Sequence, residues 1–114
     1  MQAIRDHASV KSPPQPDLPA SKDRAARAAK RLAEQTPAYL ENCRRDVIVM
    51  LAALDRADFD AVIILGHNLR GSGGGFGLQA ITDFGSGIEQ SASEADDIGA
   101  RKWLGELSAY LDET

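Results

Sequence analysis

Residues 66–77 read GHNLRGSGGGFG, and the interpretation of the whole chain depends on this segment. It places a histidine and an arginine beside five glycines that fall within residues 71–77. Such a run could be a loop that cradles a phosphate, a flexible linker, or a helix that another molecule must approach closely. Each of these alternatives predicts a different function for the protein.

As a loop, the segment imitates two nucleotide-binding motifs and completes neither. Residues 61–66 form a short apolar run that could be a buried strand leading into a glycine-rich turn. Residues 66–71 match the first half of a P-loop, but Ser72 stands where the phosphate-binding lysine belongs. Residues 75–80 imitate a dinucleotide fingerprint, yet the acidic partner and a full βαβ context are missing. A nucleotide-binding enzyme is therefore a distant alternative.

As a helix, the same segment separates into two faces. At about 100° per residue, one narrow apolar stripe lies opposite His67 and consists of Val62, Leu65, Leu69 and Phe76. Within about 60° of His67 lie two glycines, a base and two isoleucines, namely Gly71, Gly74, Arg70, Ile63 and Ile64. The helical placement explains the pattern with no residue left over, so we predict a helix with an outward-facing histidine.

The face around His67 has the chemistry of a phosphate carrier. Neutral imidazole is a nucleophile and can hold a phosphoryl group as a phosphoramidate. Arg70 follows three residues later on the same face, and its permanent charge could offset that of the phosphoryl group. A glycine inside a helix costs about 0.8–1 kcal/mol of stability relative to alanine. We therefore expect these glycines to have a role other than helix formation. Our interpretation is that Gly71 and Gly74 leave room for another protein, with Ile63 and Ile64 completing the docking patch.

The rest of the chain predicts helices after a disordered tail. Residues 1–20 contain four of the five prolines and no helical stripe, so they are predicted to be disordered. Residues 21–35 form a basic helix that is predicted to end near Thr36 and Pro37, because the residue before proline avoids the α region. Residues 37–113 hold four amphipathic segments joined by short connections, which predicts an antiparallel up-down four-helix bundle. The fold class is thus all-α, with residues 21–114 as one domain.

Side chains at the segment ends predict where individual helices begin. Asp58 is expected to cap the helix that carries His67, and Asp97 the last helix. Gly73 is expected to face the bundle and to permit close helix packing.

Composition excludes several classes of function. The net charge of −4 offers no basic field for nucleic acid. One cysteine, Cys43, rules out an intramolecular disulfide and a cysteine-based zinc site. No apolar run reaches the roughly 20 residues of a membrane span, and the N-terminus has no apolar signal core. We therefore expect a cytoplasmic protein without a membrane segment, metal or cofactor.

The segment 67–77 resembles the signature of the histidine-containing phosphotransfer (HPt) domain, which reads His-x-Leu-Lys/Arg-Gly-Ser/Ala, a few small residues, an apolar residue and Gly. The similarity extends over about residues 37–112. It includes residues 39–45 as the first bundle helix, residues 55–60 as the loop before the histidine helix, and the pair Ile88 and Glu89 after the motif. The resemblance implies that His67 is the phosphoacceptor, Arg70 the basic residue of the motif, and Gly71 the small residue that permits receiver approach.

The same resemblance implies a relay function. His67 would take a phosphoryl group from one receiver-domain aspartate and pass it to another, on response regulators or hybrid histidine kinases. Any Mg²⁺ would belong to the receivers, and the chain, acting as a monomer without an ATP site, would not phosphorylate itself. The competing hypothesis is a non-catalytic helical adaptor that binds a receiver or another signalling partner.

Overall fold

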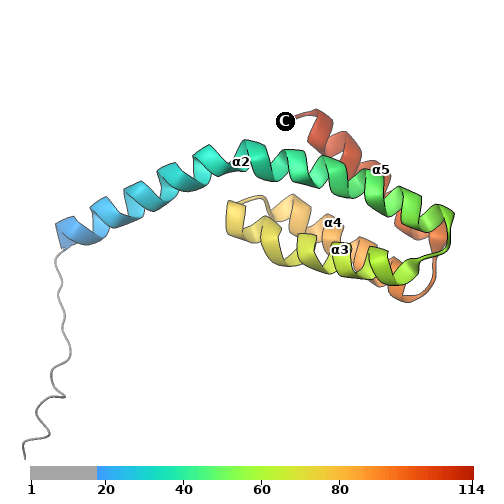
Figure 1. The fold of residues 1–114 in the computed structure, drawn as a ribbon. Coiled ribbons are helices and arrows are strands. Elements are labelled where there is room, and N and C mark those ends of the chain that lie inside the picture. The colour runs from blue at the N-terminus through green and yellow to red at the C-terminus, as the bar shows by residue number, and fades with distance from the viewer. Residues whose placement is uncertain (1–17) are drawn as a thin grey trace, which may run out of the picture. The chain divides into compact units, whose positions relative to one another are not determined.

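All regular structure in the described part of the chain, residues 18–114 of a computed structural model, is helical (Figure 1). The elements are α2 (Leu18–Asp55), α3 (Phe59–Gly73), a short 3₁₀ helix η1 (Gly74–Phe76), α4 (Gln79–Ser93) and α5 (Asp97–Asp112). The all-α prediction is thus confirmed. The predicted tail falls mostly on residues 1–17, outside the described residues, but helix α2 already begins at Leu18.

The chain divides into two units, residues 1–34 and residues 35–114, and α2 crosses the boundary between them. In the first unit, the described side chains of residues 23–31 are all exposed, as expected for a stripe made mainly of alanine. The second unit is the helical bundle, and it contains all the predicted site residues.

The predicted break at Thr36 and Pro37 was wrong, because α2 continues through Pro37 as one helix. An interior proline removes one backbone hydrogen bond and crowds the preceding turn, at a cost of about 3 kcal/mol. Strong helix formers, mostly alanine and arginine, precede this position, and the stretch after it packs into the core of the bundle. These two helical stretches outweigh the local preference of one residue.

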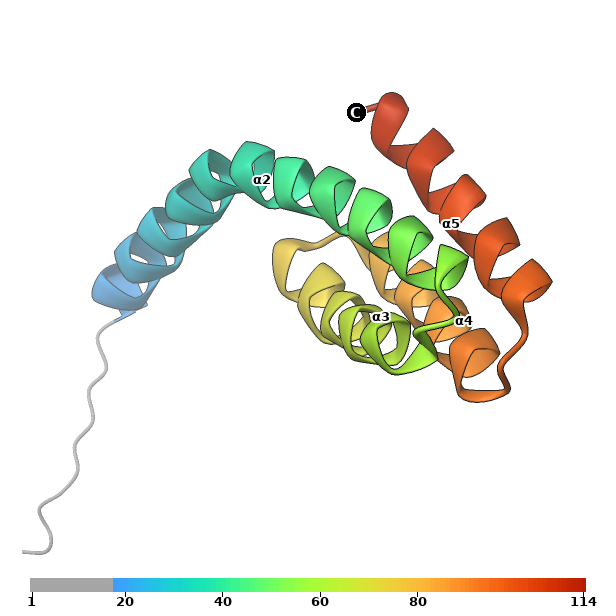
Figure 2. The ribbon, with the colours of Figure 1, turned by 45° about the vertical axis from the view of Figure 1, so that its right-hand side comes forward.

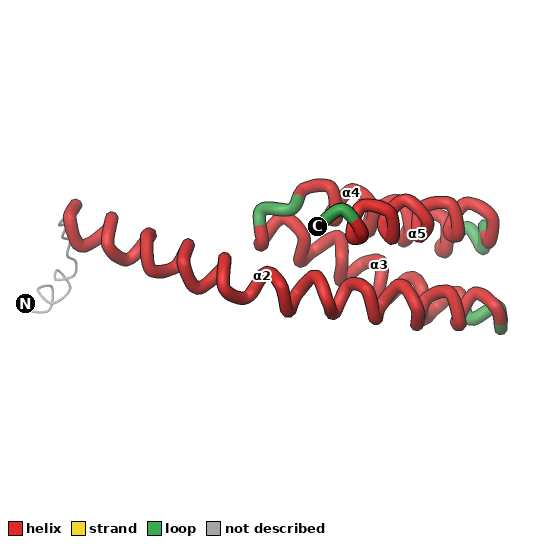
Figure 3. The backbone as a smooth tube through the Cα atoms, turned by 90° about the horizontal axis from the view of Figure 1, so that it is seen from above, coloured by secondary structure: helices red, strands yellow, loops and turns green. Residues whose placement is uncertain are grey.

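The bundle has the predicted up-down order. Successive connections lie at opposite ends of the bundle, so neighbouring helices run antiparallel (Figure 3). α3 and α4 lie side by side along their length, and α5 packs against α4 and beside α2 (Figures 1 and 2). All four helices contribute to one apolar core, made of Cys43, Val47, Met50, Ala53, Leu54, Val62, Leu69, Ile81, Ile88, Ala92, Ala100, Leu104, Leu107 and Leu111.

Aspartate side chains cap the N-termini of two of these helices. The cap of one helix is the predicted residue, and the cap of the other lies one residue before the predicted position. Asp58 caps α3, since its Oδ1 accepts a hydrogen bond from the backbone N–H of Ala61 at 3.2 Å. The cap of α5 is Asp96 rather than Asp97, and its Oδ1 accepts from the N–H of Gly99 at 2.9 Å. Asp97 lies in the first turn instead, where its carboxylate pairs with Arg101 at 2.9 Å.

The helix predicted through Phe76 is α-helical only as far as Gly73 and then tightens into η1. Gly77 ends the segment with φ of 74°, a left-handed conformation that glycine adopts without strain. The backbone N–H of Leu78 donates to the carbonyl of Gly73 at 2.9 Å, which satisfies an acceptor at the helix end. The glycine-rich segment is therefore ordered helix with a defined stop.

Candidate functional site

His67 lies on α3 in a small charged cluster with Arg70 and Glu89. Its side chain is 59% exposed. Its Nδ1 lies 3.2 Å from Glu89 Oε2 and 3.2 Å from Arg70 Nη2. Arg70 Nε in turn lies 3.3 Å from Glu89 Oε1. One carboxylate from α4 thus faces both the imidazole and the guanidinium of α3.

Glycines at the contact of α3 with α4 bring Glu89 within reach of the histidine. A Cβ atom at Gly85 would lie 2.5 Å from the backbone N of Arg70 and 2.8 Å from the carbonyl oxygen of Gly66. A Cβ atom at Gly66 would lie 3.0 Å from the backbone N of Glu89. The two backbones therefore touch at Gly66, just before His67, and again at Leu69 and Arg70, which is why a side chain from α4 can reach the ring between them. The predicted packing role of Gly73 is confirmed in the same way, since a Cβ atom there would lie 2.6 Å from the backbone N of Thr82.

The two contacts at Nδ1 make opposite demands on the imidazole. Glu89 can only accept a hydrogen bond and Arg70 can only donate one, so Nδ1 cannot satisfy both at once. When Nδ1 carries the proton and donates to Glu89, the lone pair is on Nε2. Within residues 23–114 no hydrogen-bond partner reaches Nε2, and the His67 side chain is exposed. The Glu89 contact therefore favours the tautomer with a nucleophilic Nε2 open to solvent.

Arg70 is held near Glu89 by charge rather than by a fully formed hydrogen bond. Glu89 Oε1 is buried and has no hydrogen-bond partner within the described chain, although Arg70 Nε is 3.3 Å away. The Arg70 side chain is 47% exposed. It can therefore turn toward an anionic group on His67 without breaking a bond to Oε1.

The predicted docking residues do not all lie on the open surface. Gly71 and Gly74 are exposed, and nothing lies within 4 Å of a Cβ atom built at Gly71. Ile64 is 60% exposed, as predicted. Ile63 instead is half-buried and packs against the core, contrary to its expected outward position.

Glu89 is the residue that reasoning from the sequence left out of the site. It matched a family pattern after the motif, but nothing local assigned it to His67. The available signal was Gly85, one helical turn earlier on the same face of α4, because a glycine there permits close packing against another helix. Tyr39 and Ser72 were missed for a similar reason, since their 2.7 Å hydroxyl contact joins residues 33 positions apart.

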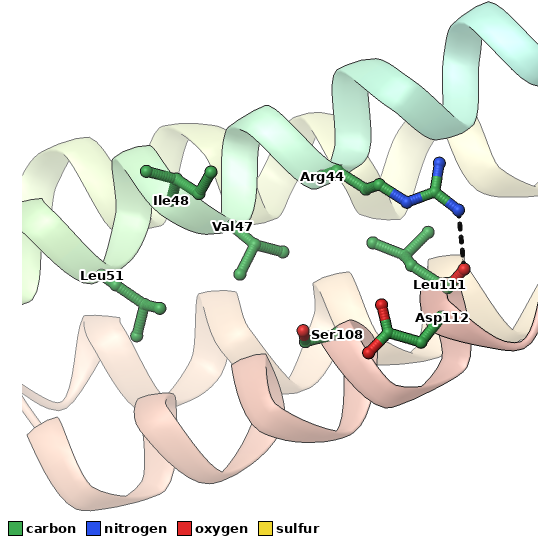
Figure 4. Close-up of a pocket in the computed structure, with 7 residues that line it drawn as sticks. All are labelled: Arg44, Val47, Ile48, Leu51, Ser108, Leu111 and Asp112. Atoms are coloured by element: carbon green, nitrogen blue, oxygen red, sulfur yellow. Dashed lines mark hydrogen bonds between the residues drawn. The ribbon is translucent and has the colours of Figure 1, made fainter.

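A separate cavity of about 270 Å³ lies between α2 and α5 (Figure 4) and contains none of the predicted site residues. Its walls are mainly apolar, and at one end Arg44 Nη2 donates to the carbonyl of Leu111 at 2.7 Å. Among the side chains that the structure describes, those of residues 23–114, no group has the composition and placement of a metal site. None of the described helices is long and apolar enough to cross a membrane.

Comparison with known families agrees with the geometry. The family model for the Hpt domain matches residues 24–114. No curated protein and no solved structure gives a significant match to the chain. The chain belongs to the Hpt domain family, and its role is a phosphotransfer-related one in two-component signalling.

Proposed function

We propose that the protein relays phosphoryl groups between receiver-domain aspartates through phospho-His67. The observation that carries this proposal is the asymmetric environment of the imidazole. Its Nδ1 faces Glu89 Oε2 at 3.2 Å, whereas its Nε2 is open on an exposed helix face. A structural surface histidine has no need of a carboxylate from a second helix to select its tautomer.

The chemical step transfers one phosphoryl group without an outside reactant. Nε2 attacks the phosphorus of a receiver's aspartyl phosphate, the P–N bond forms, and the P–O bond to the aspartate breaks. The aspartate leaves as a carboxylate, and the ring keeps the proton on Nδ1, where Glu89 accepts its hydrogen bond. Arg70 turns toward the new phosphoryl group and offsets its charge. Attack by an aspartate of a second receiver reverses the step.

Access for the receiver depends on the bare backbone one turn after the histidine. Gly71 follows His67 by four residues, so the two positions are neighbours on the helix surface. Because nothing lies within 4 Å of a Cβ atom at Gly71, the helix leaves open space there. The exposed side chain of Ile64 provides an apolar contact on the same face. Gly74 extends the bare surface by almost one turn.

Phosphotransfer from a labelled receiver tests the proposal against the adaptor hypothesis. The protein is mixed with receiver domains from the organism that encodes it, each phosphorylated with ³²P-acetyl phosphate. We expect an acid-labile, base-stable label on the wild-type chain and none on His67→Gln. Binding without label, under conditions in which the receiver phosphate survives, would support the adaptor and reject the relay.

A further inference from the structure

The glycine-rich end of α3 contacts α4 on one side and α2 on another, and the side that carries Gly71 contacts neither helix. Toward α4, Gly73 packs directly on the backbone of Thr82, and the N–H of Gly74 donates to Thr82 Oγ1 at 2.8 Å. Toward α2, the hydroxyl of Ser72 shares a 2.7 Å hydrogen bond with the hydroxyl of Tyr39. Gly71 points to neither helix.

Tyr39 makes a second contact with this segment, beyond the one to Ser72. Its ring stacks on Phe76 of η1, with centroids 4.1 Å apart and an interplanar angle of 13°. Burial raises the pKa of Tyr39 to about 12, so the hydroxyl keeps its proton at physiological pH. One side chain of α2 thus contacts the segment on both sides of its three consecutive glycines, at Ser72 and at Phe76.

The three consecutive glycines favour disorder of the helix end, which the contacts of Tyr39 oppose. Glycine loses more conformational freedom on folding than any other residue, so the run at residues 73–75 favours fraying of the helix end. Fraying would reach Gly71, whose backbone forms the surface beside His67. A docking surface that must be ordered during binding gives weaker binding than one that is ordered beforehand.

We propose that Tyr39 is a positioning residue for phosphotransfer, which holds the last turn of α3 helical through Ser72 and Phe76 so that Gly71 is presented to the receiver ready-formed. This inference rests on the proposed relay function. The hydroxyl of Tyr39 bonds to Ser72, whereas the ring of His67 faces Glu89 and Arg70, so the effect of Tyr39 falls on docking rather than on the chemical step.

The test uses Tyr39→Phe, which keeps the ring and removes the hydroxyl. The matched control is Tyr110→Phe, because Tyr110 also packs its ring on a phenylalanine, Phe84 at 5.7 Å, but its hydroxyl has no hydrogen bond within the described residues. Single-turnover transfer is measured against increasing concentrations of the phosphorylated receiver that labels the wild-type chain. Amide hydrogen exchange at residues 71–75 is measured by NMR on the free protein.

We expect Tyr39→Phe to raise the half-saturating receiver concentration by up to about fivefold, the limit set by the loss of one hydrogen bond, with an unchanged limiting rate. The amides of residues 71–75 should exchange faster by a similar factor, and Tyr110→Phe should match wild type in both measurements. Ser72→Ala should reproduce the effect, and the double variant should add nothing further, because both substitutions remove the same bond.

Three results would overturn the inference. Half-saturation within twofold of wild type in Tyr39→Phe would show that the hydroxyl does not support docking. A lower limiting rate with unchanged half-saturation would place Tyr39 in the chemical step instead. Additive effects of the two substitutions would show that they act separately. Absence of label on the wild-type chain would reject the relay function itself, which distinguishes that failure from a failure of Tyr39.

Discussion

Replacing Gly85 with alanine should both destabilise the bundle and slow phosphotransfer, because this glycine sets the distance between α3 and α4. A Cβ atom there would lie 2.5 Å from the backbone N of Arg70, and ordinary contact begins at 3.4 Å. The atoms it meets belong to the backbone of α3, so the helices themselves must separate. Glu89, one turn further along α4, would then move away from His67.

The size of the effect follows from two opposing contributions. Overpacking a well-packed contact costs about 1–3 kcal/mol. Alanine is the better helix former, which returns about 1 kcal/mol. Because the overlap at Gly85 is with backbone atoms, which cannot rotate away, the overpacking cost lies at the upper end of that range, about 2–3 kcal/mol. The net loss of stability is therefore about 1–2 kcal/mol, which corresponds to a fall of roughly 4–16 °C in Tm for a bundle of this size. Urea unfolding followed by circular dichroism at 222 nm measures it.

Gly105→Ala is the matched control, since Gly105 lies in α5 and nothing lies within 4 Å of a Cβ atom there. It should gain about 1 kcal/mol from helix propensity alone and should transfer phosphate like wild type. If Gly85→Ala were as stable as Gly105→Ala, or if it kept the wild-type transfer rate, the argument that close packing brings Glu89 to the histidine would be refuted.

Three further substitutions separate access, chemistry and folding. Gly71→Trp should abolish label transfer from the receiver while circular dichroism shows nearly unchanged helix content, and normal transfer would remove the docking argument. Glu89→Gln should slow single-turnover transfer about tenfold, because a hydrogen bond to a charged acceptor is stronger than one to a neutral acceptor; a wild-type rate would show that the tautomer does not depend on Glu89. Ala95→Gly should raise the free energy of unfolding in urea by about 1 kcal/mol, since Ala95 has φ of 54° and alanine is strained there, and unchanged stability would contradict that strain.

Hydrophobic spacing was enough to predict the bundle, because each of its helices has one continuous buried face. The stripe opposite His67 placed Val62 and Leu69 in the core, and both are buried in the structure. Pro37 was misjudged because its preference is local, whereas the helix on either side of it is supported over many residues. Spacing could predict the exposed histidine, since His67 lies opposite the apolar stripe of its own helix.

The carboxylate beside the histidine could not be predicted in the same way, because it comes from another helix, whereas Arg70 lies on α3 itself. Glu89 reaches His67 only because α4 lies unusually close to α3, and that distance depends on glycines in both helices. A helical wheel for α3 shows Gly66 but not Gly85, which lies in α4, so the wheel alone cannot show that the two helices pack closely. Ile63 was placed outward for a related reason, since a wheel of α3 alone does not show how far the rest of the bundle covers that helix.

The glycines around His67 are of two kinds: some pack against α4, and others leave open space on the surface. A Cβ atom at Gly66 or at Gly73 would lie within 3.0 Å of backbone atoms of α4, so packing within the chain accounts for these two glycines. Gly71 has nothing within 4 Å, so no contact inside the chain compensates for its poor helix propensity. An alanine there would stabilise the free protein. Open space alone does not explain a helical glycine, since Gly105 has nothing within 4 Å either. Gly71 differs in lying one turn after His67, and this position supports the proposed approach of a receiver there.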